Sequence, residues 1–298
     1  MIEQPFPLVS LIVITYNSVD LLPRFLAALA TTEYAPYELI IVDNNSTDGT
    51  LEYLAGQNCD MRVIASPHNE GFGRACNRGA ALTQGAILVF LNPDVAVTPG
   101  WLQGLVASSQ ACPDALICPT TLYPGEQPQP VAGLQQVAAI PGAALLVRRQ
   151  VWNALGGFDP HMFLYWEDAE LCWRAWLLGF RVLADRGTFV YHERGGSAGK
   201  QRWDAERTKN SLRTYVKLMR WQTVAMFALV LAVKTLVKYG RWRDPALLAA
   251  WHWNFRHLGL TLTERRMIAA RRTGDPVALE RRIRELERRL RVERRARQ

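Results

Sequence analysis

Apolar residues in the first half of the chain alternate between short continuous runs and longer stretches with helical spacing. The continuous runs are Leu8–Tyr16, Tyr37–Asp43, Met61–Ala65 and Ala86–Leu91. Short runs of this kind are typical of strands that are buried on both faces of a sheet. The helical stretches between them include Asp20–Leu29 and Gly71–Thr83. This alternation predicts βαβ units, and hence an α/β fold with a Rossmann-like, mostly parallel sheet flanked by helices.

The middle of the chain carries one further apolar run and one aromatic, acidic stretch. Gly142–Arg149 has the pattern of a strand, and Phe163–Phe180 is dense in aromatic and acidic residues. We expect a helix to begin near Glu167. Acidic side chains stabilise a helix N-terminus, which is explanation enough for at least one of Glu167, Asp168 and Glu170.

After about Asn210 the chain becomes helical in pattern, apolar and rich in Lys and Arg. Leu212–Tyr239 reads as a helix whose uncharged run, Thr223–Val233, has eleven residues and ends at Lys234. That run is too short for a membrane-spanning helix. Basic flanks with several Trp residues suit a helix that lies in a membrane interface. Packing against the first part of the chain is the alternative.

The last helical segment carries a short heptad seam on an Arg-rich helix. The seam residues are Leu279, Ile283, Leu286 and Leu290. They step by four, three and four residues, the spacing of a coiled coil. The segment could form a homodimer contact, lie on a lipid surface or extend as a solvated tail.

The charge of the chain is divided unevenly between its two parts. The net charge is +8, made up of −9 as far as Glu193 and +17 from Arg194 onward. A strongly basic part could face nucleic acid or anionic lipid. Because no zinc finger or RNA-binding aromatic signature accompanies it, we expect no sequence-specific nucleic-acid binding.

Cysteine usage and the N-terminus indicate a cytoplasmic protein. The five cysteines include no CxxC pair and fit no disulfide framework or zinc site. The first residues, MIEQPFPLVS, lack the basic region that opens a signal peptide. We therefore expect reduced thiols and no secretion signal.

Two of the predicted strands end in polar clusters. Asp43-Asn44-Asn45 follows the second strand and Asn92-Pro93-Asp94 follows the fourth. In open α/β sheets, ligands bind outside the carboxyl ends of the strands. The sequence therefore predicts a binding site at this edge of the sheet.

These clusters belong to a series of motifs that resembles a known family. The motifs are Thr15-Tyr16-Asn17, Val42–Thr50, Asn69–Gly79, Asn92-Pro93-Asp94 and Trp166-Glu167-Asp168. Their order and spacing resemble inverting family-2 glycosyltransferases with the GT-A fold, in the rhamnosyltransferase-like branch. The resemblance runs from about Val9 to Ser197, roughly two thirds of the chain. It implies a catalytic domain at residues 1–209 and a basic, amphipathic helical region at 210–298.

The resemblance implies a set of residues that bind a nucleotide-sugar donor. They are Thr15, Tyr16, Asn17, Asp43, Asn45, Asn69, Gly71, Arg74, Asn77, Asn92 and Asp94. For Ser46 to Gly49, a turn and helix cap is the simpler interpretation. Gly71 could serve only a tight turn. The segment is a poor dinucleotide fingerprint, because Cys76 stands where the third glycine is needed.

A divalent cation, Mg²⁺ or Mn²⁺, is implied by the same resemblance, because charge builds on the departing diphosphate. The family usually supplies an Asp-x-Asp motif, and here Asn92 replaces the first carboxylate. Asp94 is the expected ligand. His192, which precedes the Gly195-Gly196-Ser197 loop, is expected to complete the metal shell.

Catalysis by inversion needs a carboxylate that takes the proton of the acceptor hydroxyl. The resemblance assigns this role to Asp168 and places Gly142, Trp166 and Glu167 on the acceptor side. Glu170 and Arg174 are spaced for a salt bridge between successive helical turns.

The expected reaction belongs to the synthesis of bacterial cell-surface polysaccharide. The donor is expected to be dTDP-rhamnose, with a UDP-hexose as rival, and the acceptor a glycan or polyprenyl-linked glycan. The basic region would hold the enzyme peripherally at the anionic inner face of the plasma membrane. A nucleotidyltransferase is the weaker alternative, since the first strand lacks a Gly-rich basic loop. A non-catalytic scaffold that kept the fold is another.

Overall fold

The structure is a computed structural model that describes residues 6–129, 131, 133–140, 142–192 and 200–296. The chain divides into two compact units. The first comprises Met1–Phe158 and Arg181–Gly195, and the second Asp159–Phe180 and Gly196–Gln298. The segment with Glu167 and Asp168 therefore packs with the C-terminal helices. The predicted functional division at residue 209 stays a prediction.

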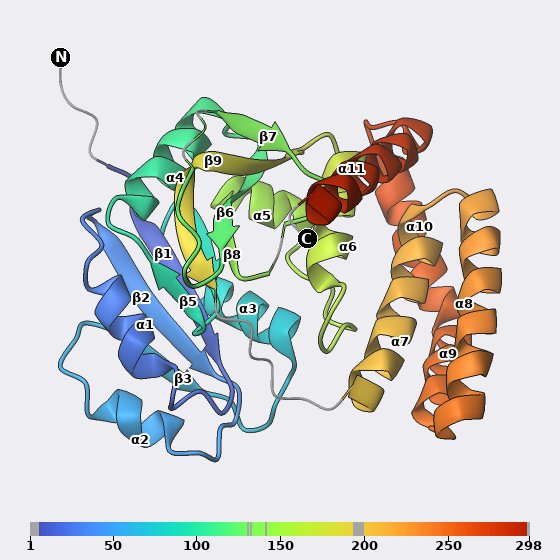
Figure 1. Ribbon diagram of the computed structural model, residues 1–298, viewed down its shortest axis with the longest axis horizontal. Coiled ribbons are helices and arrows are strands. Elements are labelled where there is room, and N and C mark those ends of the chain that lie inside the picture. Colours follow the sequence, from blue (N-terminus) through green and yellow to red (C-terminus); the bar gives the residue numbers. More distant parts are fainter. Residues whose placement is uncertain (1–5, 130, 132, 141, 193–199, 297–298) are drawn as a thin grey trace. The chain divides into compact units, whose positions relative to one another are not determined.

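The first unit is built on one mixed sheet (Figure 1), whose described strands follow the order β3-β2-β1-β4-β8-β6-β9-β5, with β7 paired to β9. The strands are β1 (Val9–Thr15), β2 (Tyr37–Asp43), β3 (Arg62–Ala65), β4 (Ile87–Leu91), β5 (Val95–Val97), β6 (Ala115–Leu122), β7 (Leu134–Gln136), β8 (Ala144–Arg148) and β9 (Arg181–His192). The pairs β3–β2, β2–β1, β1–β4 and β6–β9 are parallel, whereas β8, β5 and β7 pair antiparallel. The predicted α/β fold is confirmed.

Helices cover both faces of this sheet. Successive strand residues point to opposite faces, and every residue of β1 and β4 is buried, so both faces are packed. The helices are α1 (Leu22–Leu29), α2 (Thr50–Ala55), α3 (Phe72–Ala81), α4 (Trp101–Ala111) and α5 (Arg149–Leu155). Leu11 and Val13 join the core formed with α1 and α4. Ile12 faces α3, where a Cβ on Gly79 would lie 2.5 Å from its Cγ2 atom. Glycine at this position lets α3 approach the sheet closely.

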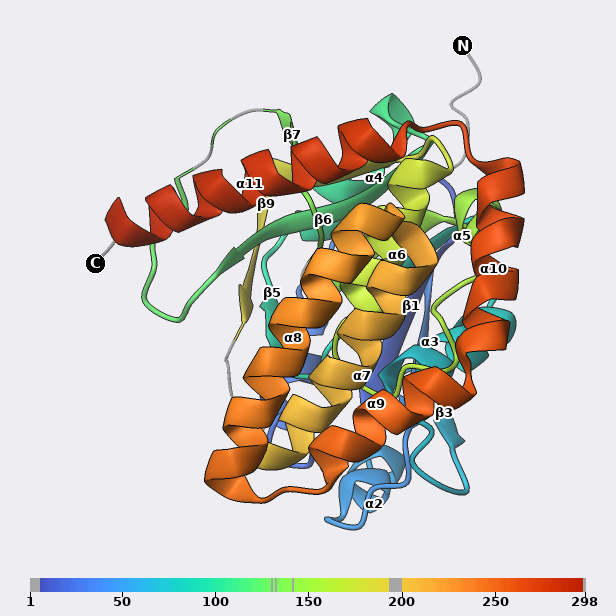
Figure 2. The ribbon, with the colours of Figure 1, turned by 90° about the vertical axis from the view of Figure 1, so that its right-hand side faces the viewer.

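The second unit consists of helices. They are α6 (Glu167–Leu177), α7 (Lys200–Leu218), α8 (Trp221–Trp242), α9 (Ala246–Arg256), α10 (Leu258–Arg271) and α11 (Pro276–Ala296). Figure 2 shows α7, α8 and α9 side by side, and each of the three helices contacts the other two. The stretch Leu212–Tyr239 is helical as predicted, but it is divided between α7 and α8. It breaks at Arg220, whose backbone is extended and whose N–H and guanidinium both donate to Glu280.

The first residues of the heptad seam are buried by packing within the chain itself. Leu279 and Ile283 are buried, and α11 packs along α6, with the Arg282 guanidinium 4.7 Å from the Trp176 ring centroid. The side chain of Leu290 lies outside the described residues. A homodimer through this seam stays a prediction, with its first two residues already committed to an internal contact.

Within the described residues, α8 is the one helix long and apolar enough to cross a membrane. It has 22 residues, and its most apolar window has a mean hydropathy of 1.5. The uncharged run Thr223–Val233 lies inside this helix, which continues past Lys234 to Trp242. One such helix is weak support for a membrane span.

Buried charges join three helices of the second unit. Arg213 on α7 is fully buried and donates to Asp159 Oδ2 at 2.9 Å and to Glu264 Oε2 at 2.7 Å. Lys217 lies 2.7 Å from Asp159 Oδ2 and 2.8 Å from Glu170 Oε1. Burial alone would raise the pKa of Asp159, but Lys217 and Arg213 hold it well below its usual range. The cluster fixes α6, α7 and α10 together.

The predicted pair of Glu170 and Arg174 is confirmed, at 2.7 Å between Arg174 Nη2 and Glu170 Oε2. Both side chains are buried and belong to this cluster. The pair is therefore a core contact and not part of a solvated helix face.

Asp159→Ala should lower the free energy of unfolding by about 3–5 kcal/mol, because two buried cations would lose a carboxylate partner. Chemical denaturation measures this. Asp204→Ala is the matched control, since it removes the ion pair to Lys238, whose side chain is 39% exposed, and should cost about 1 kcal/mol or less. Equal losses in the two variants would contradict a structural role for the buried cluster.

Candidate functional site

The predicted site residues of the first strands lie at one edge of the sheet. Thr15 of β1 is paired with Asp43 of β2, and Val13 of β1 with Leu91 of β4. The residues that follow these strands therefore emerge side by side at their carboxyl ends, as expected for a ligand site.

Asp43 organises the turn after β2. Its carboxylate is fully buried. It accepts hydrogen bonds from Thr15 Oγ1 at 2.9 Å, Ser46 Oγ at 2.5 Å and the Ser46 N–H at 2.9 Å. These local donors satisfy the carboxylate. Asp43 thus fixes the conformation of this turn, and direct contact with a nucleotide stays a prediction.

The surface above Asp43 is formed by Tyr16, Asn17 and Asn45. Tyr16 is 52% exposed, and the two asparagines have left-handed backbones, with φ of 48° and 67°. Asn17 accepts a bond from the Thr47 N–H and donates its own N–H to Ser46 Oγ. The turns after β1 and β2 are thereby locked to each other and present an aromatic ring and an exposed amide to solvent.

Asn44 connects this turn to the next motif, and the sequence analysis missed it. Its Nδ2 donates to Asn69 Oδ1, and its Oδ1 accepts from the Glu70 N–H, both at 2.9 Å. Asn69 Oδ1 also accepts from the N–H of Gly71, whose φ of 85° precedes α3. Asn44 is buried, and its place between two predicted ligands was the signal that could have identified it.

Asn77 and Arg74 have different settings on α3. The Asn77 amide donates to the Phe158 carbonyl and accepts from the Phe158 N–H, both at 2.9 Å. This pairing gives Asn77 a structural task, and a ligand contact stays a prediction. Arg74 lies on the exposed surface of α3, where a guanidinium could meet a phosphate.

Asp94 and His192 come together although almost a hundred residues separate them. The reason is the antiparallel pairing of β5 with β9, which sets Val95 opposite His192. His192 Nε2 lies 3.1 Å from Asp94 Oδ2, and both side chains are about one-fifth exposed. Asp94 Oδ1 is buried with no hydrogen-bond partner among the described residues.

This arrangement fits a divalent cation. A carboxylate oxygen and an imidazole nitrogen are ordinary ligands of Mn²⁺, and the carboxylate alone suits Mg²⁺. The described residues contain no group of three or more potential metal ligands. A cation here would therefore complete its shell with water or with ligand oxygens. The Gly195-Gly196-Ser197 loop lies outside the described residues.

The neighbours of Asp94 include two residues that the sequence analysis missed. Asp20 and Arg24 line a small pocket together with Pro93 and Asp94. Asn92 lies at the end of β4 and donates its N–H to the Ala143 carbonyl. Gly142, the predicted acceptor-side residue, therefore lies next to a residue that contacts the Asn92–Asp94 segment.

The predicted base, Asp168, and the predicted acceptor-side residue Glu167 belong to the second unit, at the N-terminus of α6. Asp168 is partly exposed, whereas Glu167 is only 6% exposed. Glu167 Oε2 is buried without a hydrogen-bond partner among the described residues. Burial raises the pKa of Glu167 to about 8, and the Asp168 carboxylate adds to the shift. The raised pKa favours the protonated form of Glu167, next to the expected base.

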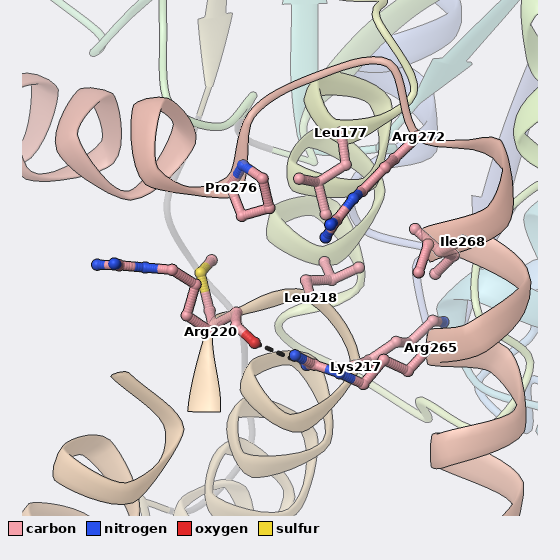
Figure 3. A pocket seen from close by; sticks show the side chains of 10 residues that line it. Leu177, Lys217, Leu218, Arg220, Arg265, Ile268, Arg272 and Pro276 are labelled. Atoms are coloured by element: carbon pink, nitrogen blue, oxygen red, sulfur yellow. Dashed lines mark hydrogen bonds between the residues drawn. The ribbon is translucent and has the colours of Figure 1, made fainter. Parts of the chain in front are cut away.

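A pocket in the second unit is lined by basic residues but contains no predicted site residue (Figure 3). Lys217 is paired with Asp159 and Glu170, and Arg220 with Glu280. Arg265 donates to the carbonyls of Val216 and Met219 at the end of α7. These cations serve the packing of the unit.

Comparison with known families gives one match that covers most of the first unit. The model of glycosyl transferase family 2 matches residues 10–186. The matched range includes the strand-end motifs, Asp94 and the Glu167–Asp168 pair, and ends before His192.

Curated relatives support the same assignment at modest identity. An N-acetylglucosaminyl-diphospho-decaprenol L-rhamnosyltransferase of Mycobacterium tuberculosis is 26% identical over 63% of this chain and 77% of its own length. An uncharacterized protein of Sinorhizobium fredii is 27% identical over 73% of this chain, which spans only 28% of that protein. An O-antigen biosynthesis protein of Myxococcus xanthus is 29% identical over 64% of this chain and 18% of its own length.

Solved structures confirm the fold. A mannosyltransferase from Pyrobaculum calidifontis, in complex with GDP-Man and Mn²⁺, has a TM-score of 0.57 at 17% identity and covers 90% of this chain and 89% of its own. GalNAc-T7 with UDP, GalNAc and Mn²⁺ has a TM-score of 0.60 at 17% identity and covers 72% of this chain and 48% of its own. The chain thus has the GT-A fold that the sequence motifs predict.

Glu167→Gln should weaken the pH dependence of stability. Because the folded-state pKa of Glu167, about 8, exceeds the ordinary value of about 4.3, the folded protein holds a proton that the unfolded chain releases between these pH values. Its contribution to stability therefore falls as pH rises from about 5 to 8 and is constant above that range. The variant lacks this loss, so its Tm relative to wild type should rise between pH 5 and pH 9.

Thermal unfolding at the two pH values measures the difference. Glu52→Gln, on the exposed side of α2, is the control and should follow the wild-type curve. Parallel curves for Glu167→Gln and wild type would show that Glu167 is ionised in the folded protein.

Proposed function

The chain belongs to glycosyl transferase family 2, and on that premise we propose that it is a metal-dependent, inverting glycosyltransferase. It transfers rhamnose or another hexose from a nucleoside-diphosphate sugar to a glycan or polyprenyl-linked acceptor. The observation that carries the proposal is the approach of His192 Nε2 to within 3.1 Å of Asp94 Oδ2. This pair lies at the sheet edge where the family motifs cluster.

On the donor side, each group has a separate task. Tyr16, Asn17 and Asn45 offer the exposed ring and amides that would hold the nucleoside. Asp94 and His192 would hold Mg²⁺ or Mn²⁺, which supplies Lewis-acid stabilisation of the leaving diphosphate. Arg74 would add positive charge near a phosphate.

On the acceptor side, Asp168 is the proposed base. The acceptor oxygen forms a bond to the anomeric carbon as the bond from that carbon to the diphosphate oxygen breaks. The hydroxyl proton passes to the Asp168 carboxylate, and the diphosphate leaves with the bonding electron pair. A single base gives inversion at the anomeric carbon. Neutral Glu167 can donate a hydrogen bond to the acceptor without competing for its proton.

The donor and acceptor are proposed from the curated relatives. The rhamnosyltransferase of M. tuberculosis acts on a decaprenol-linked sugar, and the M. xanthus relative is an O-antigen biosynthesis protein. The first supports rhamnose as the transferred sugar and a lipid-linked acceptor, and the second supports a role in cell-surface polysaccharide synthesis. The donor that we propose is dTDP-rhamnose. A UDP-hexose donor is the alternative, and a non-catalytic scaffold is the rival from another class.

A lipid-linked acceptor requires access to a membrane, and α8 offers a surface for it. Its exposed apolar stripe consists of Met226, Leu229, Val230, Val233, Leu236 and Val237, each 46–69% exposed. The opposite face of α8 is committed to the unit. Thr235 accepts a bond from Trp251 Nε1, Lys238 pairs with Asp204, and the Phe227 ring stacks on Tyr215.

Because one face of α8 is packed, the helix would lie in the membrane interface and not span the bilayer. Its ends carry Trp221 and Trp242, and Lys234 and Arg241 lie in its C-terminal half. The region from Arg194 onward carries a net charge of +17, which is complementary to an anionic leaflet. We propose a peripheral location on the inner face of the plasma membrane.

Nucleotide binding is the first test of the proposed enzyme. One of dTDP, UDP or GDP should raise the Tm, and Mn²⁺ should enlarge the rise. At 100 times Kd, a ligand adds about 2.7 kcal/mol to stability. Asp94→Ala and His192→Ala should abolish the part that depends on Mn²⁺. His68→Ala, which removes an exposed histidine, should keep it. No stabilisation by any nucleotide, with or without metal, would favour the scaffold.

Vesicle binding tests the membrane surface. The double variant Leu229→Gln/Val233→Gln should weaken binding to phosphatidylglycerol vesicles more than tenfold, because each buried apolar side chain contributes about 1.5–3 kcal/mol. Co-sedimentation measures binding. Met267→Gln, which changes an exposed apolar residue of α10, should bind like wild type. If the double variant keeps vesicle binding but changes the molar mass in solution, a second copy of the chain covers the stripe instead.

A further inference from the structure

The turn that leads into α6 has an unfavourable backbone. Tyr165 and Trp166 are consecutive non-glycine residues in the left-handed region, with φ of 67° and 75°. Such conformations are costly for residues with a Cβ, and they persist only where the surroundings enforce them. The Trp166 carbonyl accepts the Glu170 N–H at 2.9 Å, so this turn fixes where α6 begins and how Glu167 and Asp168 leave it.

Asn210 on α7 is hydrogen-bonded to the backbone of this turn. Its Nδ2 donates to the carbonyls of Leu164 at 3.0 Å and Tyr165 at 2.8 Å. The side chain is fully buried, and its Oδ1 has no hydrogen-bond partner among the described residues. The contribution of this amide is therefore donation to two successive carbonyls, which an isosteric carboxylate cannot make.

Other residues of α7 contact the side chains of Tyr165 and Trp166. The Tyr165 ring packs edge-on against Trp203 at 5.4 Å, and the Arg207 guanidinium lies 4.3 Å from its centroid. The Trp166 ring meets Tyr215 at 6.1 Å. Asn210 is central to this set because its hydrogen bonds reach the backbone of the turn, whereas Trp203, Arg207 and Tyr215 contact its side chains. The helix α7 thus acts as the template for the strained turn.

We propose that Asn210 is a positioning residue for sugar transfer. By holding the left-handed turn at Tyr165 and Trp166, it orients the Glu167–Asp168 pair so that the Asp168 carboxylate is directed at the acceptor hydroxyl. This inference rests on the proposed function of Asp168. It adds a residue outside the range matched by the family model, and it assigns a task in catalysis to a helix of the C-terminal region.

Asn254 supplies a matched control. It is also a buried asparagine of the second unit, and its Nδ2 donates to two carbonyls, those of Lys209 at 3.0 Å and Ala250 at 2.9 Å. It joins α9 to α7 and does not touch the turn. Asn210→Ala and Asn254→Ala therefore remove the same number of buried hydrogen bonds, and only the first should release the Glu167–Asp168 pair.

The experiment compares the two variants in the full-length protein, well below the Tm of each. Asn210→Ala should lower kcat for transfer at least thirtyfold at saturating donor, while nucleotide binding, read from the rise in Tm, stays within twofold of wild type. Asn254→Ala should keep kcat within threefold. Asn210→Ser, which retains one donor, should give an intermediate kcat and serves if the alanine variant does not fold.

Amide hydrogen exchange separates failure of this inference from failure of the proposed function. Exchange at Glu167 to Glu170 should accelerate in Asn210→Ala and not in Asn254→Ala, whether or not the protein transfers sugar. Accelerated exchange with unchanged kcat would overturn the positioning role, as would equal kcat losses in both variants. A wild-type protein that binds no nucleotide and transfers no sugar would refute the proposed function itself.

Discussion

The parallel register of three strands is the constraint on which the candidate site depends. Pairing of Thr15 with Asp43, and of Val13 with Leu91, brings three chain segments to one sheet edge. The buried Asp43 carboxylate then joins the first two segments, since its acceptors are filled by Thr15 and Ser46. A shift of one residue in either pair would send these side chains to the other face. Backbone pairing and a buried carboxylate thus position a surface made of exposed side chains.

The second unit solves a similar problem with buried charge. Arg213 and Lys217 on α7 are neutralised by Asp159, Glu170 and Glu264, which come from the 159–180 segment and α10. Once α7 is fixed in this way, the amide of Asn210 is in place to enforce an unfavourable turn. Buried ion pairs often contribute little net stability. Here they fix α6, the helix that carries Glu167 and Asp168, against α7.

Local patterns predicted the parallel strands and the family motifs, because alternation of apolar runs reports burial directly. They did not predict β5, β6 or β7, whose pairing depends on β8 and β9 far along the chain. The break between α7 and α8 at Arg220 depends on Glu280, and the orientation of the Asn77 amide depends on its hydrogen bonds to the Phe158 backbone. A motif shows which residue types are present. The partner that decides whether an amide faces a ligand or the backbone is set by tertiary structure.

The amide at Asn92 changes the electrostatics of the proposed metal site. A divalent cation held by the Asp94 carboxylate and the His192 imidazole would keep a net positive charge, whereas an Asp-x-Asp pair would cancel more of it. Because the described residues supply no third ligand of this kind, the diphosphate oxygens would provide the missing negative charge. Metal and donor would then bind with positive coupling, each increasing the affinity for the other. In the proposed enzyme, a weaker protein ligand set would thus tie the cation to the presence of the donor substrate.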